Sequence, residues 1–227
     1  MLDRLSYLVD LEKLKDKKVL IIGLGGVGSY ALESIVRSGI ESITIVDNDI
    51  IDITNINRQL FALNSTINLS KVEVAQKRIK DINPNCQVKI IKEFITKDNI
   101  DLLFQEKIDY LIDAIDTIDT KKLLIKNCLE KDIKIISSMG TANKLDPTLL
   151  KITDLAKTSY DPIAKILRKY VKDLKINKKV MVVCSSEQPK IKDKLGSTAY
   201  VPAVAGLLCA SYVINDIVGE RNDWRNG

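Results

Sequence analysis

The chain has no histidine among its 227 residues. A protein without imidazole side chains cannot use histidine as a general base, a proton shuttle or a metal ligand. This absence excludes serine–histidine hydrolases and enzymes whose zinc is held by histidine. Any catalysis has to rely on carboxylates, lysine, arginine, cysteine, backbone groups or the substrate itself.

Cysteine is scarce and widely spaced, with no C-x-x-C pair: the four are Cys86, Cys128, Cys184 and Cys209. A zinc site made of four cysteines needs close pairs, so we expect no zinc site. So few cysteines in so long a chain also argue against a disulfide scaffold, and we expect the reduced thiols of a cytoplasmic protein. Cys184 precedes the polar segment SSEQP, where it is either a nucleophile or a small buried residue on a strand.

We expect no signal peptide, and the sequence also lacks an uninterrupted apolar run. Its start, MLDRLSYLVDLEKLKDKK, is charged. The stretch 201–218 is mostly apolar but contains proline, glycine, asparagine and aspartate, so we expect a buried helix and no membrane span. The net charge of +5 fits either a lysine-rich solvated surface or a polyanionic partner.

The most informative segment runs from Val19 to Asp49 and reads as strand, glycine turn, helix and strand. Gly23, Gly25 and Gly28 match G-x-G-x-x-G, and Asp47 closes the second apolar run. This pattern places a phosphate at a helix N-terminus and a ribose beside a carboxylate. Taken alone, the segment favours a NAD-binding domain.

The pattern of apolar residues predicts an α/β fold. Strands alternate with helices, which indicates a Rossmann-like, mostly parallel sheet with helices on both faces. After Gly140 the alternation stops, so we expect one domain, 1–227, with a nucleotide-binding core at about 15–140 and a C-terminal substrate-specific extension at 141–227. The predicted strands are 17–22, 42–47, 87–91, 110–115, 133–137, 149–155 and 180–184, and the predicted helices are 27–37, 71–82, 97–105, 119–131, 162–174 and 201–218.

A long polar segment, 48–70, separates the second strand from the next helix. It contains Arg58, and Lys71 follows it. Two fixed positive charges suit a triphosphate, whereas a pyrophosphate held by backbone amides does not need them. Asp116 ends the predicted strand at the edge of the sheet where ligands bind, and a carboxylate there can hold magnesium beside phosphates. The alternatives are a polar loop with an incidental arginine, and an N-cap role for Asp116.

Six motifs occur in a fixed order: GLGGVGS, VDND, TNINRQ, KVEVA, INPN and DAIDT. With these motifs, residues 15–155 resemble the ThiF/MoeB-type adenylating enzymes, which share their nucleotide-binding domain with ubiquitin-activating enzymes. The resemblance implies ATP as ligand, with Asp47 at its ribose, Asp116 on the magnesium side, and Arg4 reaching into the partner's site in a homodimer. It also implies nucleotide contacts from Gly23, Gly25, Gly26, Gly28, Asn55, Arg58, Gln59 and Lys71.

The final third resembles the tRNA threonylcarbamoyladenosine dehydratases through DPTLLKITDLAKTSYDPIAKILRKYVKD, SSEQP and GSTAYVPAVAGLLCAS. The resemblance implies ATP-dependent cyclisation, with loss of water, of the modified adenosine beside the tRNA anticodon. The alternative is an adenylyltransferase that activates the C-terminus of a ubiquitin-like sulfur carrier. Such enzymes typically carry paired zinc cysteines, which this chain lacks. Whether the protein binds a monovalent cation, and whether it works with a sulfur-transfer partner, stays open.

Lysines and an arginine on the predicted helix 162–174 and the loop after residue 187 are candidates for RNA contacts, or simply form a solvated face. They are Lys165, Arg168, Lys169, Lys172, Lys175, Lys190, Lys192 and Lys194.

Overall fold

The computed structural model describes residues 2–189 and 194–219 and contains a seven-stranded sheet in the order β3-β2-β1-β4-β5-β7-β6. Neighbouring strands are parallel except β6 and β7, so the prediction of a mostly parallel, Rossmann-like sheet is confirmed. The strands are β1 (Lys18–Ile22), β2 (Ser42–Val46), β3 (Gln87–Ile91), β4 (Tyr110–Asp113), β5 (Lys134–Ser138), β6 (Leu150–Asp154) and β7 (Met181–Ser185).

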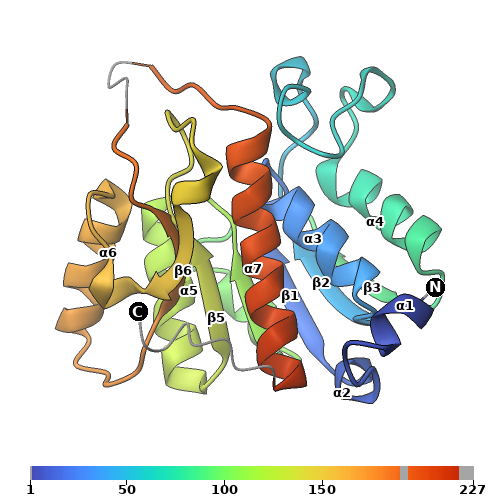
Figure 1. Ribbon diagram of the computed structural model, residues 1–227, viewed down its shortest axis with the longest axis horizontal. Helices are drawn as coiled ribbons and strands as arrows, with labels where there is room; N and C mark the ends of the chain where they lie inside the picture. Colours follow the sequence, from blue (N-terminus) through green and yellow to red (C-terminus); the bar gives the residue numbers. More distant parts are fainter. Residues whose placement is uncertain (1, 190–193, 220–227) are drawn as a thin grey trace.

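Helices cover both faces of the sheet, as predicted (Figure 1). One face is covered by α3 (Gly28–Arg37), α4 (Lys71–Ile82) and α7 (Tyr200–Val218), and the other by α5 (Ile118–Lys131) and α6 (Pro162–Asp173). The short helices are α1 (Asp3–Ser6), α2 (Glu12–Lys15) and the 3-10 helices η1 (Ile53–Asn55), η2 (Asn64–Thr66), η3 (Ile100–Phe104), η4 (Pro147–Leu149) and η5 (Leu155–Lys157).

Strand β1 shows why the central strands are apolar throughout. Val19 and Ile21 belong to the core under α3 and α7, whereas Leu20 and Ile22 belong to the core under α5. A strand buried on both faces needs apolar residues at every position. Strand order also reverses at β1, because β2 and β3 follow on one side and β4 lies on the other. Ligands of open α/β sheets bind at such a reversal, beyond the carboxyl ends of the strands.

Two predicted elements differ in the structure. The predicted helix 97–105 is the shorter 3-10 helix η3. Strand β4 ends at Asp113, three residues before Asp116, so Asp116 does not end the strand. Just after the strand, the carbonyl of Ala114 packs against the glycine turn, where a Cβ at Gly23 would lie 2.8 Å from it.

The final third is built into the same sheet. Strands β6 and β7 extend it, and α7 packs against α3. By length and composition alone α7 could cross a membrane, with 19 residues and a mean hydropathy of 1.7. However, 56% of its most apolar stretch is buried inside the structure, which is typical of a core helix and agrees with the prediction.

We predict that Gly206→Ala destabilises the fold. A Cβ at Gly206 would lie 2.2 Å from the carbonyl oxygen of Val27 and 2.9 Å from the amide nitrogen of Ala31, both in the backbone of α3 or its cap. Alanine gains about 1 kcal/mol of helix propensity, but overpacking against backbone costs about 1–3 kcal/mol or more. Urea unfolding should therefore show a net loss, whereas Leu207→Ala on the exposed side of α7 should cost less. Equal stability of the Gly206 variant and the wild type would contradict this packing.

Candidate functional site

The glycine turn lies at the carboxyl end of β1 and has no room for side chains. Gly23 has φ of +85°, in the left-handed region. A Cβ at Gly28 would lie 1.7 Å from the carbonyl oxygen of Gly23. Only glycine allows the first turn of α3 to pack this closely on the strand end. The turn therefore packs tightly between the end of β1 and the start of α3.

Helix α3 begins directly after this turn, and its N-cap residue, Val27, makes no side-chain capping hydrogen bond. The first amide groups of a helix have no partner within the helix, and they carry the positive end of its dipole. The start of α3 is therefore suited to bind an anion such as a phosphate.

Asp47 is fixed beside the turn. Its Oδ2 accepts a hydrogen bond of 2.7 Å from the amide of Leu24, and its Oδ1 accepts one of 2.9 Å from the amide of Asp49. Burial raises the pKa of Asp47, while the charge of Lys71 and the two amide donors oppose this shift. Its carboxylate is thus held at the end of β2, the position where the sequence predicts a ribose contact.

Lys71 is the first residue of α4, and its ammonium forms an ion pair of 2.7 Å with Asp49. Its side chain is only 7% exposed, whereas that of Asp49 is 57% exposed. The helix dipole disfavours a cation at a helix N-terminus. The position of the Lys71 ammonium therefore does not serve to stabilise α4. The hydroxyl of Ser70 beside it is buried without a hydrogen-bond partner in the described structure. The start of α4 therefore fits an anionic group.

The 48–70 segment brings its predicted residues to the turn. Buried Asn55 closes a capping box by accepting from the amide of Asp52 at 3.1 Å. The guanidinium of Arg58 donates to the carbonyl of Thr54 at 2.9 Å. A Cβ at Gly26 would lie 3.4 Å from Cγ of Arg58.

Gln59 lies at the same turn, because a Cβ at Gly25 would be 3.7 Å from its Nε2. Asp116 is exposed in the loop between β4 and α5, and the loop begins at Ala114, which touches the turn. The structure thus brings together the predicted residues from the glycine turn to Asp116. Their roles toward a ligand stay predictions.

The described residues contain no group of three or more histidine, cysteine or acidic side chains that could hold a metal ion. A magnesium ion that retains water and binds phosphates needs only one or two carboxylates. Asp116 as a single exposed carboxylate fits this kind of site.

Arg4 does not join the others within one chain. It is exposed in α1, and the preceding Leu2 packs at Gly39, where a Cβ would lie 2.6 Å from it. Gly39 follows the C-terminus of α3, so Arg4 lies at the opposite end of this helix from the glycine turn. The role of Arg4 in a partner's site stays a prediction.

The final third reaches the site through residues that sequence reasoning missed. Asn57 donates to the carbonyl of Ser197 at 3.0 Å, and a Cβ at Gly26 would lie 3.1 Å from Cβ of Pro202. Glu187, in the SSEQP motif, accepts from the amides of Leu145 and Asp146. Lys190 and Lys192 lie outside the described residues.

A buried ion pair lies beneath the site and was also missed. Lys121 on α5 and Asp113 at the end of β4 are 3.0 Å apart and almost fully buried. Ser137 donates to Asp113 at 2.6 Å, and Lys121 donates to the carbonyl of Ser138 at 2.8 Å. Because the pair joins a strand to a helix eight residues later across a loop, no spacing rule identifies it. It ties β4, β5 and α5 together below Asp116.

The cysteines are buried and free. Burial raises the pKa of Cys184 and Cys86 to about 11 and that of Cys128 and Cys209 to about 12. Thiols with such values carry little of the reactive thiolate at neutral pH. The arrangement therefore favours the structural reading of Cys184. The chemistry that the site offers is binding of phosphates by amides, lysine and arginine.

Comparisons with known proteins identify the family of this chain. The ThiF family matches residues 4–226. A tRNA threonylcarbamoyladenosine dehydratase of Bacillus subtilis is 44% identical over 92% of this chain and 90% of the relative. The crystal structure of the Escherichia coli enzyme of that name, TcdA, in complex with AMP has a TM-score of 0.87 and 36% identity, covering 92% of this chain and 89% of that one. Its ATP complex has a TM-score of 0.86 and 34% identity, covering 96% and 91%.

A more distant relative matches a smaller part. A probable molybdopterin-synthase adenylyltransferase of Porphyra purpurea is 42% identical, but over 52% of this chain and 31% of the relative.

We predict that Lys121→Met lowers the free energy of unfolding by about 3–5 kcal/mol, because it leaves the buried carboxylate of Asp113 without its cation. Urea unfolding followed by circular dichroism measures this loss. Lys122→Met is the matched control, since its pair with the exposed Asp119 should contribute less than about 1 kcal/mol. Equal losses in the two variants would show that the buried pair is not a special constraint.

Proposed function

Because the chain belongs to the ThiF family, we propose that it uses ATP to dehydrate threonylcarbamoyladenosine in tRNA. The observation that carries the proposal is the contact between two parts of the chain beyond the carboxyl edge of the sheet. There Asn57 of the 48–70 segment donates to Ser197, and Gly26 of the glycine turn lies against Pro202. The dehydratase relative matches both parts, whereas the adenylyltransferase relative matches about half of the chain.

In this proposal the glycine turn and the start of α3 hold the phosphates of ATP, and Asp47 accepts from its ribose. Arg58 and Lys71 neutralise charge on the phosphates. Lys71 leaves Asp49, or shares its charge, when the triphosphate arrives. Asn55 keeps the Arg58 turn in place, since the amides of Arg58 and Gln59 donate to its carbonyl at 3.1 and 2.9 Å.

The first step activates a carboxylate. The threonyl carboxylate oxygen of the modified base attacks the α-phosphorus of ATP, and pyrophosphate leaves. The product is an acyl-adenylate, whose AMP is a far better leaving group than the oxide of a free carboxylate. Positive charge fixed at Arg58 and Lys71 stabilises the crowded phosphate as it gains charge.

The second step needs no protein nucleophile. The ureido oxygen of the same side chain attacks the activated carbonyl carbon, AMP leaves, and a five-membered ring closes with loss of the ureido proton to solvent. Well-oriented intramolecular reactions reach effective molarities of roughly 10⁵–10⁸ M. A chain without histidine and with buried cysteines is suited to this chemistry.

Magnesium, when bound beside Asp116, would supply further charge neutralisation at the phosphates. A homodimer in which Arg4 approaches the partner's ATP also belongs to the proposal, as does a cytoplasmic location. The division into a nucleotide-binding core and a substrate-specific part belongs to it as well. A monovalent cation and a sulfur-transfer partner are further expectations, and both are tested by adding the purified component to the assay.

The test is nucleoside mass spectrometry of tRNA after incubation with the protein, ATP and magnesium. We expect threonylcarbamoyladenosine to lose the mass of one water, with AMP and pyrophosphate formed in equal amounts. No loss of water, together with pyrophosphate exchange stimulated by a ubiquitin-like carrier, would instead support the adenylyltransferase alternative.

We predict that Arg58→Ala and Lys71→Ala each lower turnover by about 10²–10³, since each removes a charge that stabilises the reacting phosphates. Circular dichroism should show an intact fold, because Arg58 is partly exposed and Asp49 can be solvated without Lys71. Arg37→Ala and Lys77→Ala, two exposed positions on α3 and α4, are the controls and should keep full activity. Full turnover in the Arg58 and Lys71 variants would contradict the triphosphate assignment.

We also predict a pH dependence of ATP binding. Burial raises the pKa of Asp47, so its carboxylate becomes protonated and stops accepting from the ribose at a higher pH than an ordinary aspartate would. Affinity should be constant above this pKa and fall as the pH drops through it. Calorimetric titrations of wild type and Asp47→Asn measure the effect, because protonation of ATP is common to both. Parallel pH profiles in the two proteins would rule out Asp47 as the cause.

A further inference from the structure

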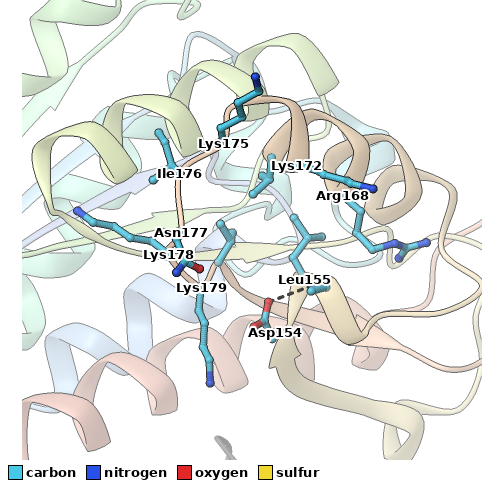
Figure 2. A pocket seen from close by; sticks show the side chains of 12 residues that line it. Asp154, Leu155, Arg168, Lys172, Lys175, Ile176, Asn177, Lys178 and Lys179 are labelled. Atoms are coloured by element: carbon cyan, nitrogen blue, oxygen red, sulfur yellow. Dashed lines mark hydrogen bonds between the residues drawn. The ribbon is translucent and has the colours of Figure 1, made fainter.

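A groove of about 820 Å³ lies between the C-terminal end of α6 and the residues that lead into β7. Its lining contains five cationic residues and a single carboxylate, Asp154. Figure 2 shows Arg168, Lys172, Lys175, Lys178 and Lys179 spread around the rim, each from α6 or the segment after it. The floor is apolar, made by Leu155, Val171, Ile176 and Val180.

The groove is remote from the glycine turn. Strand β7 is parallel to β5, so the residues entering β7 lie at the amino edge of the sheet, whereas the glycine turn lies at the carboxyl edge. Helix α6 connects the two edges. It starts beside Gly140, just beyond β5, where a Cβ would lie 3.4 Å from the N-cap carboxylate of Asp161. Its 12 residues span about 18 Å and end at the groove.

Most of the charge in the groove is not neutralised. Lys178 pairs with Asp132 at 2.7 Å, and Asp154 accepts from the amide of Ala156 at 3.0 Å. Lys172, Lys175 and Lys179 have no ion-pair partner within residues 2–189 and 194–219. Cations in the last turn of a helix are favoured by its dipole, which accounts for Lys172. It does not account for the lysines entering β7.

The backbone conformation of Lys175 lowers stability. It follows the C-cap of α6 with φ of +54°, a conformation in which glycine is the usual residue. A non-glycine residue there is strained, so glycine would be the more stable choice for the backbone alone. The lysine found there in place of glycine puts a positive charge at the mouth of the groove.

We propose that this groove binds the sugar–phosphate backbone of the tRNA substrate, away from the nucleotide that reacts. The inference rests on the proposed function. A linear polyanion is favoured over an acidic protein because the cations continue in a row. Exposed Lys165, Lys169 and Lys172 recur at helical spacing along α6, from the carboxyl edge of the sheet toward the groove. The lining also contains no aromatic side chain, the type that anchors protein partners.

The test compares Lys172→Gln/Lys175→Gln with wild type in tRNA binding at several salt concentrations, by fluorescence anisotropy. Each lost phosphate contact should lower the slope of log K against log salt by about 0.7–0.9. Two contacts should weaken binding by about 14–30-fold near physiological salt, because a slope change of about 1.4–1.8 acts over the range from 1 M down to about 0.15 M. In the dehydration assay we expect the KM for tRNA to rise by the same factor, while kcat and the KM for ATP stay unchanged.

The control variant is Lys77→Gln/Lys80→Gln, which removes the same charge from the exposed face of α4. An equal loss of tRNA affinity in both variants, or an unchanged slope in the groove variant, would overturn the proposal. Failure of the proposed function has a different signature, since the wild type would then bind tRNA without dehydrating it. Wild type that dehydrates tRNA, with a groove variant of unchanged tRNA affinity, would leave an acidic protein as the occupant and refute RNA binding here.

Discussion

The structure depends on the close approach of backbone to backbone around the start of α3. A Cβ at Gly28 would lie 1.7 Å from the carbonyl of Gly23, and a Cβ at Gly206 would lie 2.2 Å from the carbonyl of Val27. The first contact seats α3 on the end of β1, and the second seats α7 on α3. Both meet at the reversal of strand order, so one patch of tight packing positions the glycine turn, α7 and the edge of the sheet that binds ligands.

Charged groups then complete this edge. The carboxylate of Asp47 accepts hydrogen bonds from the amides of Leu24 and Asp49, and the carboxylate of Asp49 forms an ion pair with Lys71. The chain of contacts ties the end of β2 to the start of α4, and it keeps a lysine where a helix dipole disfavours it. Below the edge, Lys121 and Asp113 join the ends of β4 and β5 to α5 in a fully buried pair. In some proteins a buried ion pair matters more for fixing one defined geometry than for stability. Here the pair fixes the base of the loop that contains Asp116.

The absence of histidine is consistent with this architecture. Proton transfer by a side chain is not the main requirement when the substrate supplies its own nucleophile. What the protein must provide is charge complementary to a triphosphate and a fixed orientation of two substrates.

The sequence by itself determined the local elements and the kind of site. Apolar periodicity predicted α4 to the residue, since Val72, Ala75 and Ile79 face the core, and the glycine spacing predicted the turn because no other residue allows its φ and packing. The short-range motifs also predicted a set of site residues near the glycine turn, and the resemblance in the final third indicated the substrate.

Only the tertiary structure decided which residues meet across the chain. It placed Lys121 against Asp113, Asn57 against Ser197, Pro202 over Gly26, and the cationic ends of α6 and β7 around one groove. It also moved the end of β4 from Ile115 back to Asp113. These contacts join segments far apart in sequence, and they depend on the order of strands in the sheet. No periodicity or spacing within one segment encodes that order.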